Sequence, residues 1–384
     1  MQDNTSYQNL MRLLIMYMST RLLGNALSLG FTLLLLAVLP GMATAAIVKG
    51  LYSQAVPVVG QSHQEQADAM SQALANVLVK VAGRHEILSN SVVQTGLDKP
   101  EAYIRKFGFH TNELSGNRQQ YFQAEFDEKA INQLLRNAGV AIWGQSRPST
   151  LVWLAVEKDG QRSIINASGS FPEIFAESFQ DRGLPLVFPL MDFEDTATIS
   201  TIDVWGGFTR KLLEASRRYG SESILAGRLS RSLSQDYELF YGRLSLIFRG
   251  VNHSVVVNGL DSVAVSQLAA DLVGTTLSRH YASNTTNTAS GKTLLVVKDI
   301  SSLKDYAALN KYLERMTAIR DASVRRVAGT TVELELVIDG SESQLVDSLA
   351  LDRNLRAVSP ASQRVRGTGA PSTTPSALVY RWIR

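Results

Sequence analysis

The spacing of apolar residues switches repeatedly along this chain between strand and helix patterns, and this switching constrains the fold more than any other feature. In residues 331–338, TVELELVI, apolar and polar side chains alternate as in a strand with one buried face. In residues 63–82 the apolar side chains recur with helical spacing, and Ser62 and Glu65 match the sequence pattern of a capping box. Such patterns follow one another from about residue 46 to residue 358. The chain is therefore expected to combine α/β and α+β units.

The order of these patterns predicts three small two-layer sandwiches. The central one is expected to hold a mixed sheet with helices, and the last one to be ferredoxin-like, because its pattern is β-α-β-β-α. Stretches rich in small polar residues separate or follow them. The predicted divisions are a signal peptide at 1–45, an N-terminal α+β domain at 46–147, a central α/β domain at 148–283, a linker at 284–291, a C-terminal ferredoxin-like domain at 292–358 and a flexible tail at 359–384.

The N-terminal segment has the features of a secretory signal. Arginines precede an apolar run whose centre, Leu29–Leu39, is shorter than the roughly 20 residues needed to span a bilayer. The small residues Ala43–Ala45 follow as a cleavage pattern. We expect Sec export, cleavage near Ala45 and a periplasmic mature chain without a transmembrane helix; an uncleaved anchor is the alternative. No cysteine follows, so a lipoprotein anchor is excluded.

The composition excludes several classes of function. The absence of cysteine excludes disulfides, thiolate nucleophiles and cysteine-based zinc sites. The net charge is only +3 and the basic residues are not clustered among aromatic ones, so nucleic acid is not an expected partner. Gly-Lys-Thr at 291–293 matches the end of a phosphate loop, but a polar linker precedes it and an apolar strand follows. Because a phosphate loop leads from a strand into a helix, no nucleotide is expected here.

The densest acidic group comprises Asp192, Glu194 and Asp195, directly after a predicted strand. Ligands of α/β proteins bind beyond the carboxyl ends of strands. Three carboxylates in so short a stretch suit Ca²⁺ or Mg²⁺, so these residues are the candidate metal ligands, and no other cofactor is expected. The alternative is a solvated turn that caps the next element.

The last residues, ALVYRWIR, provide candidate partner-binding side chains. Tyrosine, tryptophan and arginine are enriched at interface hot spots, and the candidates are Tyr380, Arg381, Trp382 and Arg384. Alternatively, the alternation of Leu378 with Tyr380 and Trp382 would let this segment return as an edge strand on the last domain.

No catalytic set stands out. There is no G-x-S-x-G motif, and no two histidines have the helical spacing of metal ligands. Ser301 and Lys304 match S-x-x-K without its companion motifs, and Ser302 with Asp305 is expected to cap a helix. A triad assembled from distant residues remains possible in principle. The histidines are His63, His85, His110, His253 and His280.

Three long stretches resemble a known family. GVAIWGQSRPSTLVWLAV at 139–156, DRGLPLVFPLMDFEDTATIS at 181–200 and DVWGGFTRKLLEASRRYGSESILAGRLS at 203–230 are similar to the domain-of-unknown-function (DUF) 2066 family of uncharacterised gammaproteobacterial envelope proteins. The resemblance covers most of residues 46–281 and implies a secreted protein. The family has no accepted activity, so it assigns no catalytic residues to this sequence. The layout is also similar to small α/β domains of periplasmic assembly proteins, which bind other proteins.

Together these features favour a periplasmic protein that binds an envelope protein partner and is not an enzyme. The alternative is a periplasmic hydrolase or metal-dependent enzyme whose site is built from distant residues. The oligomeric state is left open.

Overall fold

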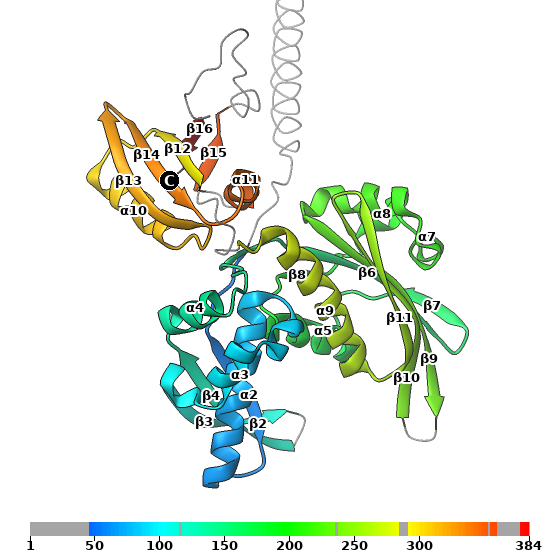
Figure 1. Cartoon of the computed structure of the whole chain (residues 1–384). Helices are drawn as coiled ribbons and strands as arrows, with labels where there is room; N and C mark the ends of the chain where they lie inside the picture. Colours follow the sequence, from blue (N-terminus) through cyan, green and yellow to red (C-terminus); the bar gives the residue numbers. More distant parts are fainter. Residues whose placement is uncertain are drawn as a thin grey trace, which may run out of the picture. The chain divides into compact units, whose positions relative to one another are not determined.

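The computed structural model describes residues 46–114, 117–234, 237–283, 291–351, 354–358 and 377–383. The expected signal peptide, most of the expected linker and Arg384 lie outside these residues. The described chain has a mixed α/β fold, with three sheets of three or more strands and helices packed on them, as predicted (Figure 1). Among the described helices, none has the length and apolar character needed to cross a bilayer.

The first sheet is antiparallel, with strand order β2-β4-β3, and helix α2 packs on it. The capping box of Ser62 and Glu65 is present at the start of α2, and Gly83 ends the helix with a φ of +79°. Both ends therefore lie where the sequence predicts. The elements are β1 (Ala46–Ile47), β2 (Ser53–Val58), α2 (His63–Ala82), η1 (His85–Ser89), α3 (Ser91–Leu97), η2 (Pro100–Tyr103), β3 (Ile104–Leu114), β4 (Asn117–Phe126), α4 (Glu128–Asn137) and β5 (Ser146–Arg147), the last pairing with β1.

The second sheet has the order β11-β10-β9-β6-β7, with β8 beside β6. It is mixed, because β6 runs parallel to β9 and β8 while its other pairs are antiparallel. The elements are β6 (Thr150–Lys158), β7 (Gln161–Ile164), α5 (Ser170–Asp181), β8 (Leu186–Val187), α6 (Phe193–Thr198), α7 (Thr201–Gly206), α8 (Thr209–Ser216), η3 (Arg217–Tyr219), β9 (Ser223–Ser234), β10 (Tyr237–Phe248), β11 (Val251–Leu260) and α9 (Ser262–Tyr281).

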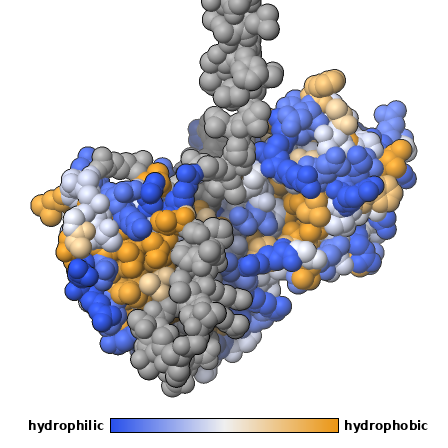
Figure 2. Space-filling model, turned by 90° about the horizontal axis from the view of Figure 1, so that it is seen from above, coloured by the Kyte–Doolittle hydropathy of each residue, from blue (hydrophilic) through white to orange (hydrophobic). Residues whose placement is uncertain are grey.

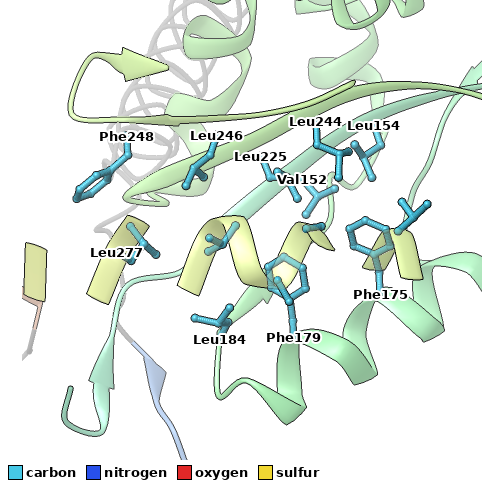
Figure 3. Packing of buried hydrophobic residues seen from close by; sticks show 14 of the residues in the cluster. Val152, Leu154, Phe175, Phe179, Leu184, Leu225, Leu244, Leu246, Phe248 and Leu277 are labelled. Atoms are coloured by element: carbon cyan, nitrogen blue, oxygen red, sulfur yellow. The ribbon is translucent and has the colours of Figure 1, made fainter. Parts of the chain in front are cut away.

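Helices cover both faces of this second sheet (Figure 1). On one face, α9 lies between the strands and α5, and Phe175 and Phe179 of α5 point into the same core as Leu277 of α9 (Figure 3). On the other face, α7 and α8 pack against Leu151 and Trp153 of β6. Strand β6 is thus buried on both sides, which explains why its sequence is continuously apolar rather than alternating.

The apolar spacing of Phe208, Leu212, Ala215 and Tyr219 predicts a helix from Gly206 to Tyr219 with these side chains on one face, but the helix starts later. Ser200 and Asp203 form a capping box that starts α7, and Gly207, with a φ of +67°, donates its N–H to carbonyls of that helix and ends it. A second helix, α8, begins at Thr209. The expected helix start was therefore wrong, because the left-handed conformation that glycine adopts readily ends a helix here.

The third sheet has the order β13-β14-β12-β16-β15. Strands β13, β14 and β12 lie next to one another in the order of a ferredoxin-like sheet. Strand β16 then pairs in parallel with β12, and β15 pairs with β16 at the edge of the sheet instead of with β12. The end of the chain thus forms a strand, as the alternation indicates, yet an interior strand and not an edge strand. The elements are β12 (Gly291–Lys298), α10 (Leu303–Glu314), β13 (Ile319–Ala328), β14 (Thr331–Ile338), α11 (Glu342–Leu351), β15 (Leu355–Ala357) and β16 (Ala377–Trp382).

A fully buried arginine, Arg147, joins α2 to the segment that follows α5. Its guanidinium lies 4.2 Å from the centre of the Trp143 ring. None of its hydrogen-bond partners among the described residues is a carboxylate, so backbone carbonyl dipoles and the Trp143 ring compensate its charge. The acceptors are the carbonyl oxygens of Lys80, Trp143, Gly144, Arg182 and Gly183.

Candidate functional site

The acidic candidates surround one arginine, Arg218, which follows α8. Asp192 binds it with both carboxylate oxygens, at 2.6 and 2.8 Å from the two terminal nitrogens. Asp195 accepts from the same guanidinium at 3.2 Å, and the Glu194 carboxylate lies 3.6 Å from Nε. Asp192 is also the N-cap of α6 and accepts the Asp195 N–H. The structure therefore brings all three predicted residues together, around a cation that the sequence itself supplies.

The second carboxylate oxygen of Asp195 also accepts hydrogen bonds. It accepts the Met191 N–H at 2.8 Å and the hydroxyl hydrogen of Tyr219, whose oxygen in turn accepts the Leu190 N–H. Burial and the hydrogen bond to Asp195 raise the pKa of Tyr219 to about 12. We name Asp192, Asp195, Arg218 and Tyr219 the ionic clamp, since together they fix the start of α6 against the end of α8.

The ionic clamp makes it harder for a metal ion to bind to these carboxylates. Its carboxylates already bind a guanidinium, and the Arg218 hydrogen bonds lower the pKa of Asp192 to about 2. A Ca²⁺ or Mg²⁺ ion would have to displace Arg218. Across the described residues, no group of three or more histidine, aspartate or glutamate side chains has an arrangement suited to a metal.

The candidate partner-binding residues near the end of the chain lie in or beside the third sheet. Tyr380 and Trp382 are buried in its core, and Trp382 contacts Tyr312 edge to face. Arg381 forms an ion pair with Asp299 at 2.8 Å. A partner could reach the two aromatic side chains only if β16 left the sheet, and a role for Arg384 stays a prediction outside the described residues.

Large apolar side chains are instead exposed on the helices that the clamp holds. They belong to α6, α7, α8 and the adjoining loops, and α6 and α7 both contact α8. Apolar spacing indicates a buried Phe208, but as the N-cap residue of α8 this side chain projects outward. The exposed fractions are 68% for Leu190, 88% for Phe193, 72% for Ile202, 52% for Phe208 and 45% for Leu213.

Two arginines beside these side chains have no carboxylate partner in the described chain. Arg210 of α8 and Arg217 of η3 lie three and four residues from Leu213, are exposed and have no ion pair among the described residues. Nearby carboxylates already have partners: Glu214 pairs with Lys211, and Glu194 with Arg218. We name the five exposed apolar residues, together with Arg210 and Arg217, the α6–α8 surface. In the space-filling view, hydrophobic residues reach the surface in separate groups among hydrophilic ones (Figure 2).

Two histidines have carboxylate partners. His85 lies 3.1 Å from Asp271, and His280 lies 2.8 Å from Asp347. Neither imidazole is hydrogen-bonded to a serine hydroxyl in the part of the chain that the structure describes. Neither histidine therefore forms the serine–histidine–carboxylate arrangement of a hydrolytic triad, and such a triad stays a prediction.

Comparison with protein families corrects the resemblance drawn from the sequence. Residues 45–144 match the model of a family described as Domain of unknown function (DUF8605), which is a different family from DUF 2066. The matched residues form the first sheet and its helices. Two of the three stretches that suggested DUF 2066, at 181–200 and 203–230, lie outside the match, so the identification was wrong. No curated protein matches the chain.

Proposed function

We propose that this protein is a secreted, non-catalytic binding factor of the bacterial cell envelope that docks a partner protein on the α6–α8 surface. The observation that carries the proposal is the exposure of large apolar side chains on and beside helices that the ionic clamp holds together. Isolated exposed apolar residues are ordinary, whereas several on one short segment are characteristic of interaction sites.

The clamp supports binding because it reduces the entropy lost on docking. Arg218 and Asp195 tie α6 to the end of α8, so Phe193 is presented from a fixed backbone. A surface that is ordered before binding gives up less conformational freedom when the partner arrives.

The charges indicate which partner fits. Arg210 and Arg217 lack carboxylate partners within the described chain, whereas Glu214 pairs with Lys211 and Glu194 contacts Arg218. Electrostatic complementarity then favours a partner segment that carries acidic residues beside large apolar ones. We commit to that class of partner, with a lipid surface as the competing outcome of the test.

Site-specific photo-crosslinking in intact cells tests the proposal. A photoreactive side chain replaces Phe193 in the full chain, and the matched control replaces Val327, which is 61% exposed on β13. We expect Phe193 to yield one defined protein adduct, whose cross-linked segment is acidic and apolar, and Val327 not to yield it. Reversing the charges with Arg210→Glu and Arg217→Glu should abolish the adduct.

Three results would contradict the proposal. The first is no protein adduct at Phe193, the second is the same adduct at Val327, and the third is an adduct that survives charge reversal. Cross-linking of Phe193 to lipid alone would replace the protein partner by a membrane surface.

A further inference from the structure

A cavity of ≈ 230 Å³ lies between the start of α8 and the outer face of β9 and β10. Two arginines line it, Arg228 of β9 and Arg243 of β10, and no aspartate or glutamate is among the residues around it. Apolar walls come from α7, α8 and the sheet, and Ser245 and Asn252 add a hydroxyl and an amide. The cavity thus combines concentrated positive charge with a few polar groups.

The two arginines are directly opposed. In the antiparallel ladder of β9 and β10, Arg243 is the register partner of Arg228, so both side chains lie on one face of the sheet. Like charges directly opposite each other destabilise a sheet. Within the described residues neither pairs with a carboxylate, and Arg243 donates only to the Ser254 hydroxyl oxygen, at 3.0 Å. A local arrangement that weakens the fold without compensation is often found at functional sites.

A glycine sets the backbone beside this pair. Gly242 has a φ of +155°, and a Cβ there would lie 2.0 Å from the Arg228 carbonyl oxygen. Any larger residue would force the strands apart at the position where the two guanidinium groups face the cavity. The close approach of β9 and β10 therefore depends on glycine at this position.

The start of α8 adds to the positive potential. Its N-cap residue, Phe208, provides no side-chain hydrogen bond to the first turn, and Thr209 lines the cavity. Uncapped N–H groups at a helix N-terminus favour a nearby anion.

From the opposed arginines and the carboxylate-free cavity, we infer that this site binds a small oxyanion, a phosphate or a carboxylate group. The inference goes beyond the docking surface and rests chiefly on Arg228 and Arg243, which are not part of that surface. The anion has two conceivable sources, a free phosphate compound or an acidic side chain of a docked protein. Both present oxygen atoms that a guanidinium binds with paired hydrogen bonds.

Calorimetric titration of the full chain with inorganic phosphate, and separately with succinate, tests the inference at constant ionic strength. We expect saturable binding of at least one anion. Arg228→Gln and Arg243→Gln should each weaken it about tenfold or more, because each removes a charge-assisted hydrogen bond. Arg231→Gln is the matched control, since Arg231 lies on the same strand, pairs with Glu238 and does not line the cavity.

The titrations distinguish the two sources of the anion and can also overturn the inference. A preference for phosphate indicates a free phosphate ligand, and a preference for succinate indicates an acidic side chain. No saturable binding of either anion, or binding that Arg228→Gln leaves unchanged in a folded variant, would overturn the inference. The chain with Arg210→Glu and Arg217→Glu should still bind the anion, so failure of the docking proposal and failure of this one are distinguishable.

Discussion

Arg147 carries a full charge at a fully buried position, and only backbone carbonyls accept its hydrogen bonds. Replacing it leaves several buried acceptors without a donor and opens a cavity beside Trp143. We therefore expect Arg147→Ala to lower the free energy of unfolding by about 3 kcal/mol or more, measured by urea denaturation. The exposed and unpaired Arg217 gives the control, Arg217→Ala, with an expected change within about 0.5 kcal/mol. Equal effects of the two substitutions would contradict this account.

Asp192 makes stability depend on pH in the acid range. Its pKa is about 2 in the folded chain, against an ordinary value of 3.8, chiefly because of the Arg218 hydrogen bonds. A lowered pKa means that the folded state favours the ionised form. The resulting stabilisation is complete above about pH 4 and is lost as the pH falls toward about 2.

Asp192→Asn should therefore flatten the decline of unfolding free energy between about pH 4 and pH 2, measured by urea denaturation at a series of pH values. The control is Glu177→Gln, because Glu177 is exposed on α5 and has no ion pair in the described part of the chain. An identical acid-side decline in the wild-type and Asp192→Asn chains would rule out this role for the clamp.

At the scale of single residues, the sequence predicts what is decided locally. Ser62 with Glu65 and Ser302 with Asp305 lie within one helical turn, and both pairs cap helices as expected. The clamp is different, because Arg218 is far from Asp192 along the chain and no local pattern joins them. The carboxylates therefore suggested a metal ion, since their actual cation was not visible in their own segment.

At the scale of elements, β16 contributes much of its sheet's core. It lies between β12 and β15, and Trp382 is buried against Tyr312. Trp382→Ala should lower the unfolding free energy by about 3–5 kcal/mol in chemical denaturation. Ile383→Ala is the neighbouring control, because that side chain is 37% exposed, and a small change is expected. A small change for Trp382→Ala as well would show that β16 adds little to the core.

The predicted elements were most accurate where an apolar pattern was long. Helix α2 and strand β14 lie where their spacing indicates. The helix predicted from Gly206 to Tyr219 was less accurate, because apolar spacing did not show that α7 ends at Gly207 and that α8 begins only at Thr209. Spacing also counted Phe208 as buried, whereas the helix break turns it outward.

At the scale of the whole molecule, the fold class was predictable and the family was not. Alternating helix and strand patterns require layered sandwiches, and a mixed α/β chain with three principal sheets is what forms. The family match covers the first sheet, while the ionic clamp, the α6–α8 surface and the arginine cavity all belong to the second. The matched region therefore carries none of the features on which the proposed functions rest. The domain boundaries drawn from composition stay predictions.

The parallel pairing of β12 with β16 also affects the order in which the third sheet can form. During synthesis β12 appears early, together with α10, β13 and β14, but its second neighbour follows only after α11 and β15. Until then one edge of β12 has no partner, and an open strand edge invites pairing with other chains. The addition of β16 to the third sheet is therefore a late and non-local step, which is the slow kind of folding step.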